Sequence, residues 1–129
     1  AIPGKRLGAL LPTATKTDCR AMCVGPRGQV WAAVRGWFGK DGDRLHLVSY
    51  QPGDDAPRDR GPLAVRNPKF TAFAGADGKP LPWSHGFRKT ADGTLTPRYH
   101  MGVCESRSGV VYMTVIYPYT LLEIHLPKD

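Results

Sequence analysis

The chain has 129 residues, of which 41% are apolar and 22% charged, which excludes a disordered chain and supports one modest domain with one core. Its 15 glycines and 12 prolines disfavour a helical protein and suit short strands joined by tight turns. The net charge is +7, and the basic residues are spread singly, so we expect no nucleic-acid partner. An acidic polymer stays open as an alternative ligand.

No apolar run approaches the roughly 20 residues that a membrane-spanning helix needs, so we expect no membrane span. The chain opens on Ala1 without a signal-peptide pattern, and we expect a processed product or a segment of a longer protein. The chain has three cysteines, an odd number. Cys19 and Cys23 would lie about 13 Å apart on a strand, beyond the roughly 7 Å that a disulfide allows. We therefore expect the thiols of Cys19, Cys23 and Cys104 to be small buried apolar groups.

Strand-like segments follow one another along the whole chain, separated by turn signals rich in glycine, proline and aspartate. The predicted strands are Cys19–Val24, Gln29–Arg35, Arg44–Tyr50, Gly61–Val65, Met101–Glu105, Val110–Tyr117 and Leu121–Leu126. No eleven-residue window has a helical period. The sequence therefore predicts an all-β fold.

Two of these segments resemble each other. Residues 22–34 match residues 103–115 without a gap, at a constant offset of 81. The matched pairs are Cys23 with Cys104, Gly28 with Gly109, Val30 with Val111, Trp31 with Tyr112, and Val34 with Val115. A third strand follows each copy, and Gly8–Leu11 and Gly61–Ala64 precede them as a possible fourth strand.

Repeated four-stranded antiparallel units are typical of β-propeller blades. We expect one domain over residues 1–129, with blade strands in residues 8–66 and 99–126 and an insertion at about 67–96. A β-sandwich with two hairpins alike by chance is the alternative.

Gly25–Ala32, which reads G-P-R-G-Q-V-W-A, resembles a turn and strand of propellers related to gluconolactonase, strictosidine synthase and the streptogramin lyases. Residues 67–86 and Asp92–Pro97 resemble segments of uncharacterised secreted bacterial propeller proteins. The resemblance implies a propeller fold and a secreted or periplasmic location. It implies no particular reaction.

In a propeller, the loops of one face usually hold the ligand, and here they would be residues 36–43, 67–98 and 118–120. The candidate ligand-binding residues on that face are Trp37, Phe38, Trp83, His85, Arg88 and His100. Asp77-Gly78 and Asp92-Gly93 also suit hairpin turns, so the insertion is alternatively a set of extra strands packed by their own aromatic residues.

No nucleophile elbow, P-loop, dinucleotide fingerprint or paired zinc motif is present. We therefore expect a binding module for a protein or carbohydrate, with no cofactor. The alternative is a lactonase-like hydrolase or lyase whose channel holds His85 and His100. Asp92 or Glu105 would then supply oxygen to a divalent metal ion.

Two further expectations concern packing and assembly. Val30, Ala32, Val34, Val111, Met113 and Val115 should pack between blades and be more buried than Gln29, Arg35 and Thr114. The second unit stops after its third strand at Leu126, whereas the Gly8–Leu11 strand has no blade of its own. We therefore expect several copies, preferably three with six blades, in which each N-terminal strand completes a neighbour's blade. A longer ring of which this chain is a part is the alternative.

Overall fold

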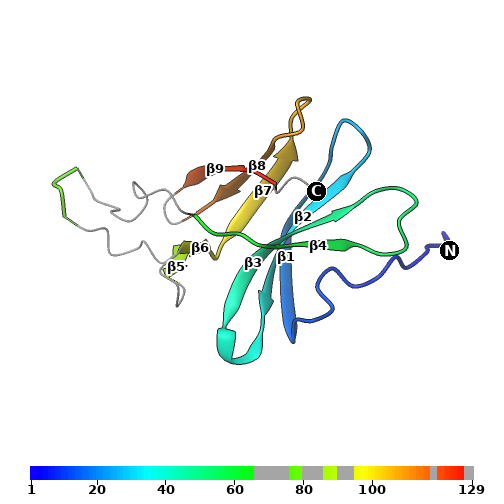
Figure 1. Cartoon of the computed structure of the whole chain (residues 1–129), viewed down its shortest axis with the longest axis horizontal. Coiled ribbons are helices and arrows are strands. Elements are labelled where there is room, and N and C mark those ends of the chain that lie inside the picture. Colours follow the sequence, from blue (N-terminus) through cyan, green and yellow to red (C-terminus); the bar gives the residue numbers. More distant parts are fainter. Residues whose placement is uncertain (66–75, 80–85, 90–94, 117–118, 127–129) are drawn as a thin grey trace.

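The computed structural model describes residues 1–65, 76–79, 86–89, 95–116 and 119–126, and its described part contains nine strands (Figure 1). They are β1 (Lys16–Val24), β2 (Val30–Trp37), β3 (Asp43–Tyr50), β4 (Arg58–Pro62), β5 (Phe87–Lys89), β6 (Leu95–Pro97), β7 (His100–Glu105), β8 (Val111–Val115) and β9 (Thr120–Ile124). The 3-10 turn η1 (Gly39–Asp41) joins β2 to β3. In the described ranges, no helix has the length and apolar character to cross a membrane.

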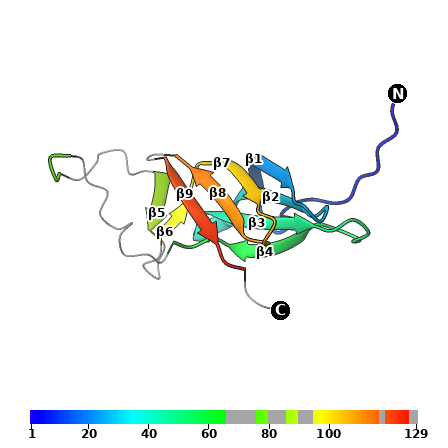
Figure 2. The same cartoon turned by 90° about the horizontal axis from the view of Figure 1, so that it is seen from above.

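All three sheets are antiparallel, and none of them closes on itself. The first has the strand order β1-β2-β3-β4, the second has the order β7-β8-β9, and β5 and β6 form a two-stranded hairpin. Figure 2 shows the second sheet lying across the first, with the β5–β6 hairpin at one end. The all-β prediction is therefore confirmed.

The β1–β2 and β7–β8 hairpins share their geometry at an offset of 81 residues. In the turns, the Gly28 N–H donates to the carbonyl of Gly25, and the Gly109 N–H donates to the carbonyl of Ser106, each at 3.0 Å. Both turn glycines have positive φ, 78° and 85°. The register shifts also correspond, because the first strand of each hairpin is irregular between residues 19 and 21 and between residues 100 and 102.

The main core lies between the first and second sheets. The face of the first sheet that carries Trp31 and Ala33, here called its inner face, packs against Val111, Met113 and Val115 of β8. Leu45, Leu47, Phe87 and Leu122 complete this core. Phe87 comes from β5, so the hairpin caps one end of the sheet pair.

A second apolar cluster covers the opposite, outer face of the first sheet. Leu11 packs there with Ala32, Val34 and Val48, and all four side chains are buried. β2 is therefore buried on both faces. Its sequence agrees with this position, since its apolar residues follow one another instead of alternating with polar residues.

This arrangement corrects the expected core. Five of the six expected residues are buried and Val30 is half-buried, but those of β2 face away from those of β8. Instead, Trp31 and Ala33 meet the second sheet. Arg35, expected to be less buried, is only 8% exposed, because its guanidinium is ion-paired inside the fold.

Other details of the prediction are wrong. Gly8–Leu11 forms no strand, because the side chain of Leu11 is instead buried in the outer-face cluster. The fourth strand of the first sheet is Arg58–Pro62 rather than Gly61–Val65. Cys19 and Cys104 are exposed thiols and Cys23 is half-buried, and none of the three forms a disulfide.

Candidate anion-binding site at the end of the first sheet

Asp43 is the centre of a charged cluster where β2 passes into β3. It stands opposite Trp37 in the sheet, on the inner face that also carries Arg35. The Arg35 Nε donates a hydrogen bond of 2.8 Å to Asp43 Oδ2. Both side chains are nearly buried, with 9% and 12% exposed, so this pair is fixed in the fold.

Two more arginines reach the same carboxylate from the other side. The Arg88 Nε, from β5, lies 3.4 Å from Asp43 Oδ1, and the Arg98 Nε, just after β6, lies 3.5 Å from Asp43 Oδ2. An Nη2 of Arg88 also donates to the backbone carbonyl of Asp43. The hairpin β5–β6 is therefore tied to the first sheet through its arginines.

The cluster carries an excess of positive charge. Burial acts to raise the pKa of Asp43, but the hydrogen bond and charge of Arg35 and the charge of Arg98 outweigh it, so this pKa is lowered. Asp43 is therefore ionised at neutral pH, and among the described side chains in direct contact with it, this one carboxylate faces three guanidiniums, so that positive charge exceeds negative charge within this group.

Arg88 and Arg98 are the accessible members of the cluster. The side chains of both are 30% exposed. Within the described residues, their buried Nε atoms have no hydrogen-bond acceptor, since the Asp43 oxygens lie in ion-pair range but outside hydrogen-bond geometry. Each guanidinium carries five N–H donors in a planar fork, the kind of group that binds carboxylates and phosphates.

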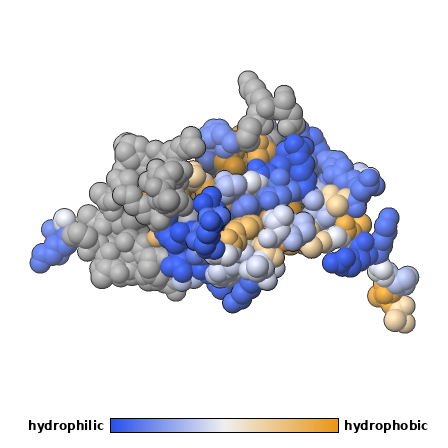
Figure 3. All heavy atoms as spheres, turned by 60° about the horizontal axis from the view of Figure 1, so that its bottom comes forward, coloured by the Kyte–Doolittle hydropathy of each residue, from blue (hydrophilic) through white to orange (hydrophobic). Residues whose placement is uncertain are grey.

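Aromatic rings line the cluster. The Arg35 guanidinium carbon lies 4.4 Å from the centre of the Trp37 ring, and Lys16 Nζ lies 4.9 Å from it. The Tyr99 ring lies 5.5 Å from Arg35 and 5.6 Å from Arg98. Such cation–π contacts hold the arginine side chains in defined positions. Figure 3 views the end of the molecule at which β2 turns into β3, and hydrophilic atoms predominate over its described part.

The structure places two of the candidate residues, Trp37 and Arg88, in this cluster. Phe38 lies elsewhere, against the outer-face cluster, where its ring stacks on His46 at 4.9 Å. Neighbouring residues of a strand point to opposite faces, which explains why Trp37 and Phe38 separate. Trp83 and His85 lie outside the described residues.

His100 is fully buried between β1 and β7 and has a structural partner. The backbone N–H of Arg20, at the irregularity of β1, donates a hydrogen bond of 2.9 Å to His100 Nε2. Burial lowers the pKa of His100 to about 4, so the ring is neutral at pH 7. Since Nε2 already accepts this bond, His100 holds the two sheets together, and we do not assign it to the site.

Sequence reasoning singled out none of Arg35, Asp43 and Arg98, which belong to no motif, although the predicted candidate face included the positions of Asp43 and Arg98. Arg35 carried the one available signal, because it follows a run of apolar residues in a strand. A charge in such a place requires a partner of opposite sign. The partner itself could not be read from the sequence.

No protein-family model, curated protein or solved structure matches the chain. Over the described ranges, no group of three or more His, Cys, Asp or Glu side chains could hold a metal ion. The arginine cluster is therefore the site on which a functional proposal rests.

Proposed function

We propose that this chain is a binding module, built from propeller-type blades, that holds a ligand through a carboxylate or phosphate group at the Asp43 cluster. The blade assignment is supported by the four-stranded antiparallel order of the first sheet and by the matching geometry of its first hairpin in the second sheet. The face-to-face packing of the two sheets also suits neighbouring blades.

One observation carries the proposal: three arginines converge on one carboxylate. The Arg35–Asp43 pair is nearly buried and serves as the fixed base of the site. The side chains of Arg88 and Arg98 are partly exposed. A second carboxylate or a phosphate placed beside them would accept hydrogen bonds from their guanidiniums and balance the excess charge. Arginine forks bind both groups in a bidentate manner.

The loops support this role as well. Asp43 is the first residue of β3, directly after the loop around η1, Arg88 lies in β5, and Arg98 lies in the short connection between β6 and β7. Binding residues are commonly carried by loops on a rigid scaffold. The candidate face predicted from the sequence contained the positions of all three residues.

Isothermal titration calorimetry with citrate and inorganic phosphate at low ionic strength tests the proposal. Arg88→Gln and Arg98→Gln should each weaken binding about tenfold, since one charge-assisted hydrogen bond contributes roughly 1.5–3 kcal/mol. Arg107→Gln is the matched control: it removes one exposed arginine in the β7–β8 turn, away from the cluster.

The variant series separates a defined site from general charge attraction. Equal weakening by Arg107→Gln and Arg88→Gln would mean that only the net charge matters, and the site assignment would be wrong. Trp37→Phe gives a second readout, because the loss of the indole next to Arg35 should remove any ligand-dependent change in tryptophan fluorescence that comes from the site.

A further inference from the structure

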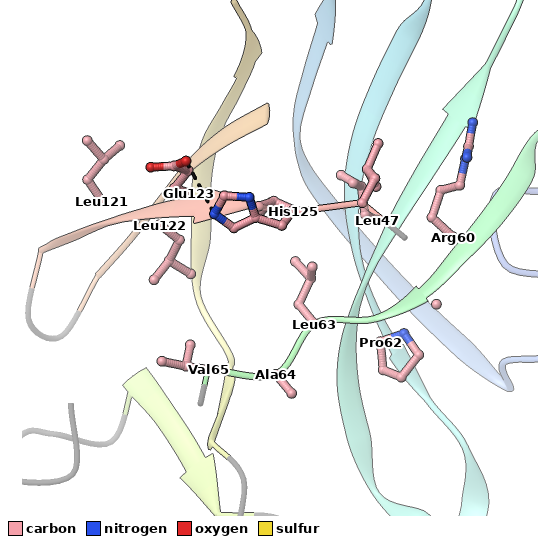
Figure 4. A pocket seen from close by; sticks show the side chains of 13 residues that line it. Leu47, Arg60, Pro62, Leu63, Ala64, Val65, Leu121, Leu122, Glu123 and His125 are labelled. Carbon is pink, nitrogen blue, oxygen red and sulfur yellow. Dashed lines mark ion pairs between the residues drawn. The ribbon is translucent and has the colours of Figure 1, made fainter. Parts of the chain in front are cut away.

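The second sheet lacks a counterpart of β4. The first sheet has four strands, whereas within the described residues β9 pairs with β8 alone. The space beside β9 is a groove of about 770 Å³ (Figure 4). Leu63 and Val65 line one side of this groove, and Leu122, Ile124 and Leu126 line the other. The groove therefore has apolar side chains on both sides, with the polar side chains of Arg60, Glu123 and His125 also in its lining, and among the described strands it adjoins the outer edge of β9.

The N-terminal segment Lys5–Leu11 has the sequence pattern of the strand that is missing. It matches Arg58–Ala64 at an offset of 53, with a basic residue first, a glycine fourth and a leucine sixth. Gly8 and Gly61 both have positive φ, 132° and 102°. In the first sheet, Arg58–Pro62 of this pattern forms β4.

Both segments continue in the same way. After Gly61, Leu63 packs into the core that the second sheet lines. After Gly8, Leu10 packs on the outer face of the first sheet. Each leucine thus anchors its segment on the next sheet along the chain. The residues before Gly61 pair with β3 of the first sheet, whereas the residues before Gly8 pair with no strand among the described residues.

Residues 1–9 are exposed and belong to no strand. The segment stands away from the body of the molecule in Figures 1 and 2. In Figure 3, apolar atoms form part of the end that projects on the same side. An extended segment of this kind can reach a strand edge of another molecule.

The outer faces of the two sheets carry exposed apolar side chains that such a contact would cover. On the first sheet, Met22 and Val24 of β1 share the outer face with Ala32 and are 69% and 65% exposed. On the second sheet, Leu121 of β9 points away from the core and is 64% exposed. The outer face of one copy's first sheet can therefore stack on the outer face of another copy's second sheet.

We propose that copies of this chain assemble head to tail, and that Lys5–Ala9 of one copy pairs with β9 of the next as the fourth strand of its second sheet. Leu10 and Leu11 stay on their own first sheet and set the position of the neighbour. Such heterologous contacts close into a ring when the rotation permits it. Three copies would give six blades, built from the first and second sheet of each copy, within the range of four to eight blades in propellers.

Size-exclusion chromatography with multi-angle light scattering between about 1 and 100 µM tests this assembly. The full chain should elute at a multiple of 14.1 kDa, with three as the expected number. The double variant Arg6→Pro/Leu7→Pro should be monomeric. Alternate backbone N–H groups of the added strand point towards β9, so one of two adjacent prolines removes a hydrogen-bond donor to β9. The control Ile2→Pro changes a residue outside the pairing segment, which is 97% exposed against 39% for Leu7, and should leave the mass unchanged.

Near-ultraviolet circular dichroism checks that the double variant keeps its fold, which we expect because the changed residues are exposed. Leu121→Lys offers an independent route to the monomer through the stacking face. A monomeric wild-type chain at 100 µM would overturn the proposal. So would a double variant that stays assembled, or a control that dissociates equally.

Discussion

The β1–β2 and β7–β8 hairpins have the same backbone design but different surroundings. Their turns, glycines and irregular positions correspond at an offset of 81 residues. Yet β2 is buried on both faces, whereas Tyr112 and Thr114 of β8 are half-buried and exposed. Local sequence therefore fixes the shape of each hairpin, and the neighbouring layers decide what each side chain does.

The pair Trp31 and Tyr112 shows this difference most clearly. Trp31 is 2% exposed, and its Nε1 donates a hydrogen bond of 2.9 Å to Glu105 Oε1. Glu105 itself is almost fully buried, with 1% of its side chain exposed. The hydrogen bond links the β1–β2 hairpin to β7. Tyr112 takes the matching place in β8 but points away from the core.

The largest expected effect is therefore an unequal response at these two positions. Trp31→Ala should cost about 4 kcal/mol in unfolding free energy, because it leaves a cavity and removes the indole hydrogen bond to the buried Glu105 carboxylate, which then keeps only the bond from the exposed Arg27. Tyr112→Ala should cost about 1 kcal/mol. Chemical denaturation in urea measures both, and equal losses would contradict the assigned faces. Trp31→Phe serves as a milder variant if the alanine variant does not fold.

The second comparison pairs His100 with Cys19, which occupy matching positions at the irregularities of β7 and β1. Burial lowers the folded-state pKa of His100 from 6.5 to about 4. Between these two pH values the unfolded chain binds a proton at this histidine and the folded chain does not. The contribution of His100 to the free energy of unfolding is therefore fully present above pH 6.5 and is lost as the pH falls towards 4. The free energy of unfolding should fall by about 3 kcal/mol over this pH range.

Urea denaturation at several pH values between 4 and 7 tests this expectation. His100→Gln should flatten the pH dependence in that interval, because glutamine does not titrate. Cys19→Ala should leave the slope unchanged, since this thiol is exposed and ionises only at high pH. A slope that survives in His100→Gln would assign the effect to other groups.

The smallest effect should be the same in both hairpins. Gly28 and Gly109 have positive φ, where a side chain is strained whatever space surrounds it. Gly28→Ala and Gly109→Ala should each lower the unfolding free energy by about 1 kcal/mol. Thermal unfolding of the two variants checks the match. If the losses of unfolding free energy in the two variants differ by more than about 1 kcal/mol, the two turns are not equivalent.

The sequence by itself determined six of the described strands, the turns within the two hairpins and the hairpin equivalence; the six strands are β1, β2, β3, β7, β8 and β9. Alternating and β-branched residues between glycine-rich turns encode these features over short distances. The glycines at positions 28 and 109 require a tight turn, and the constant offset of 81 follows directly from the residues. No knowledge of distant contacts is needed for such local features.

Only the tertiary structure decided the faces and the site. The apolar run of β2 gives no alternation, so the sequence could not say that Trp31 rather than Val34 meets the second sheet. Arg35 and Asp43 are eight residues apart, but Arg88 and Arg98 reach them from 45 and more residues away. Charges so distant in the chain come together only through the packing of sheets, which depends on all the side chains between them.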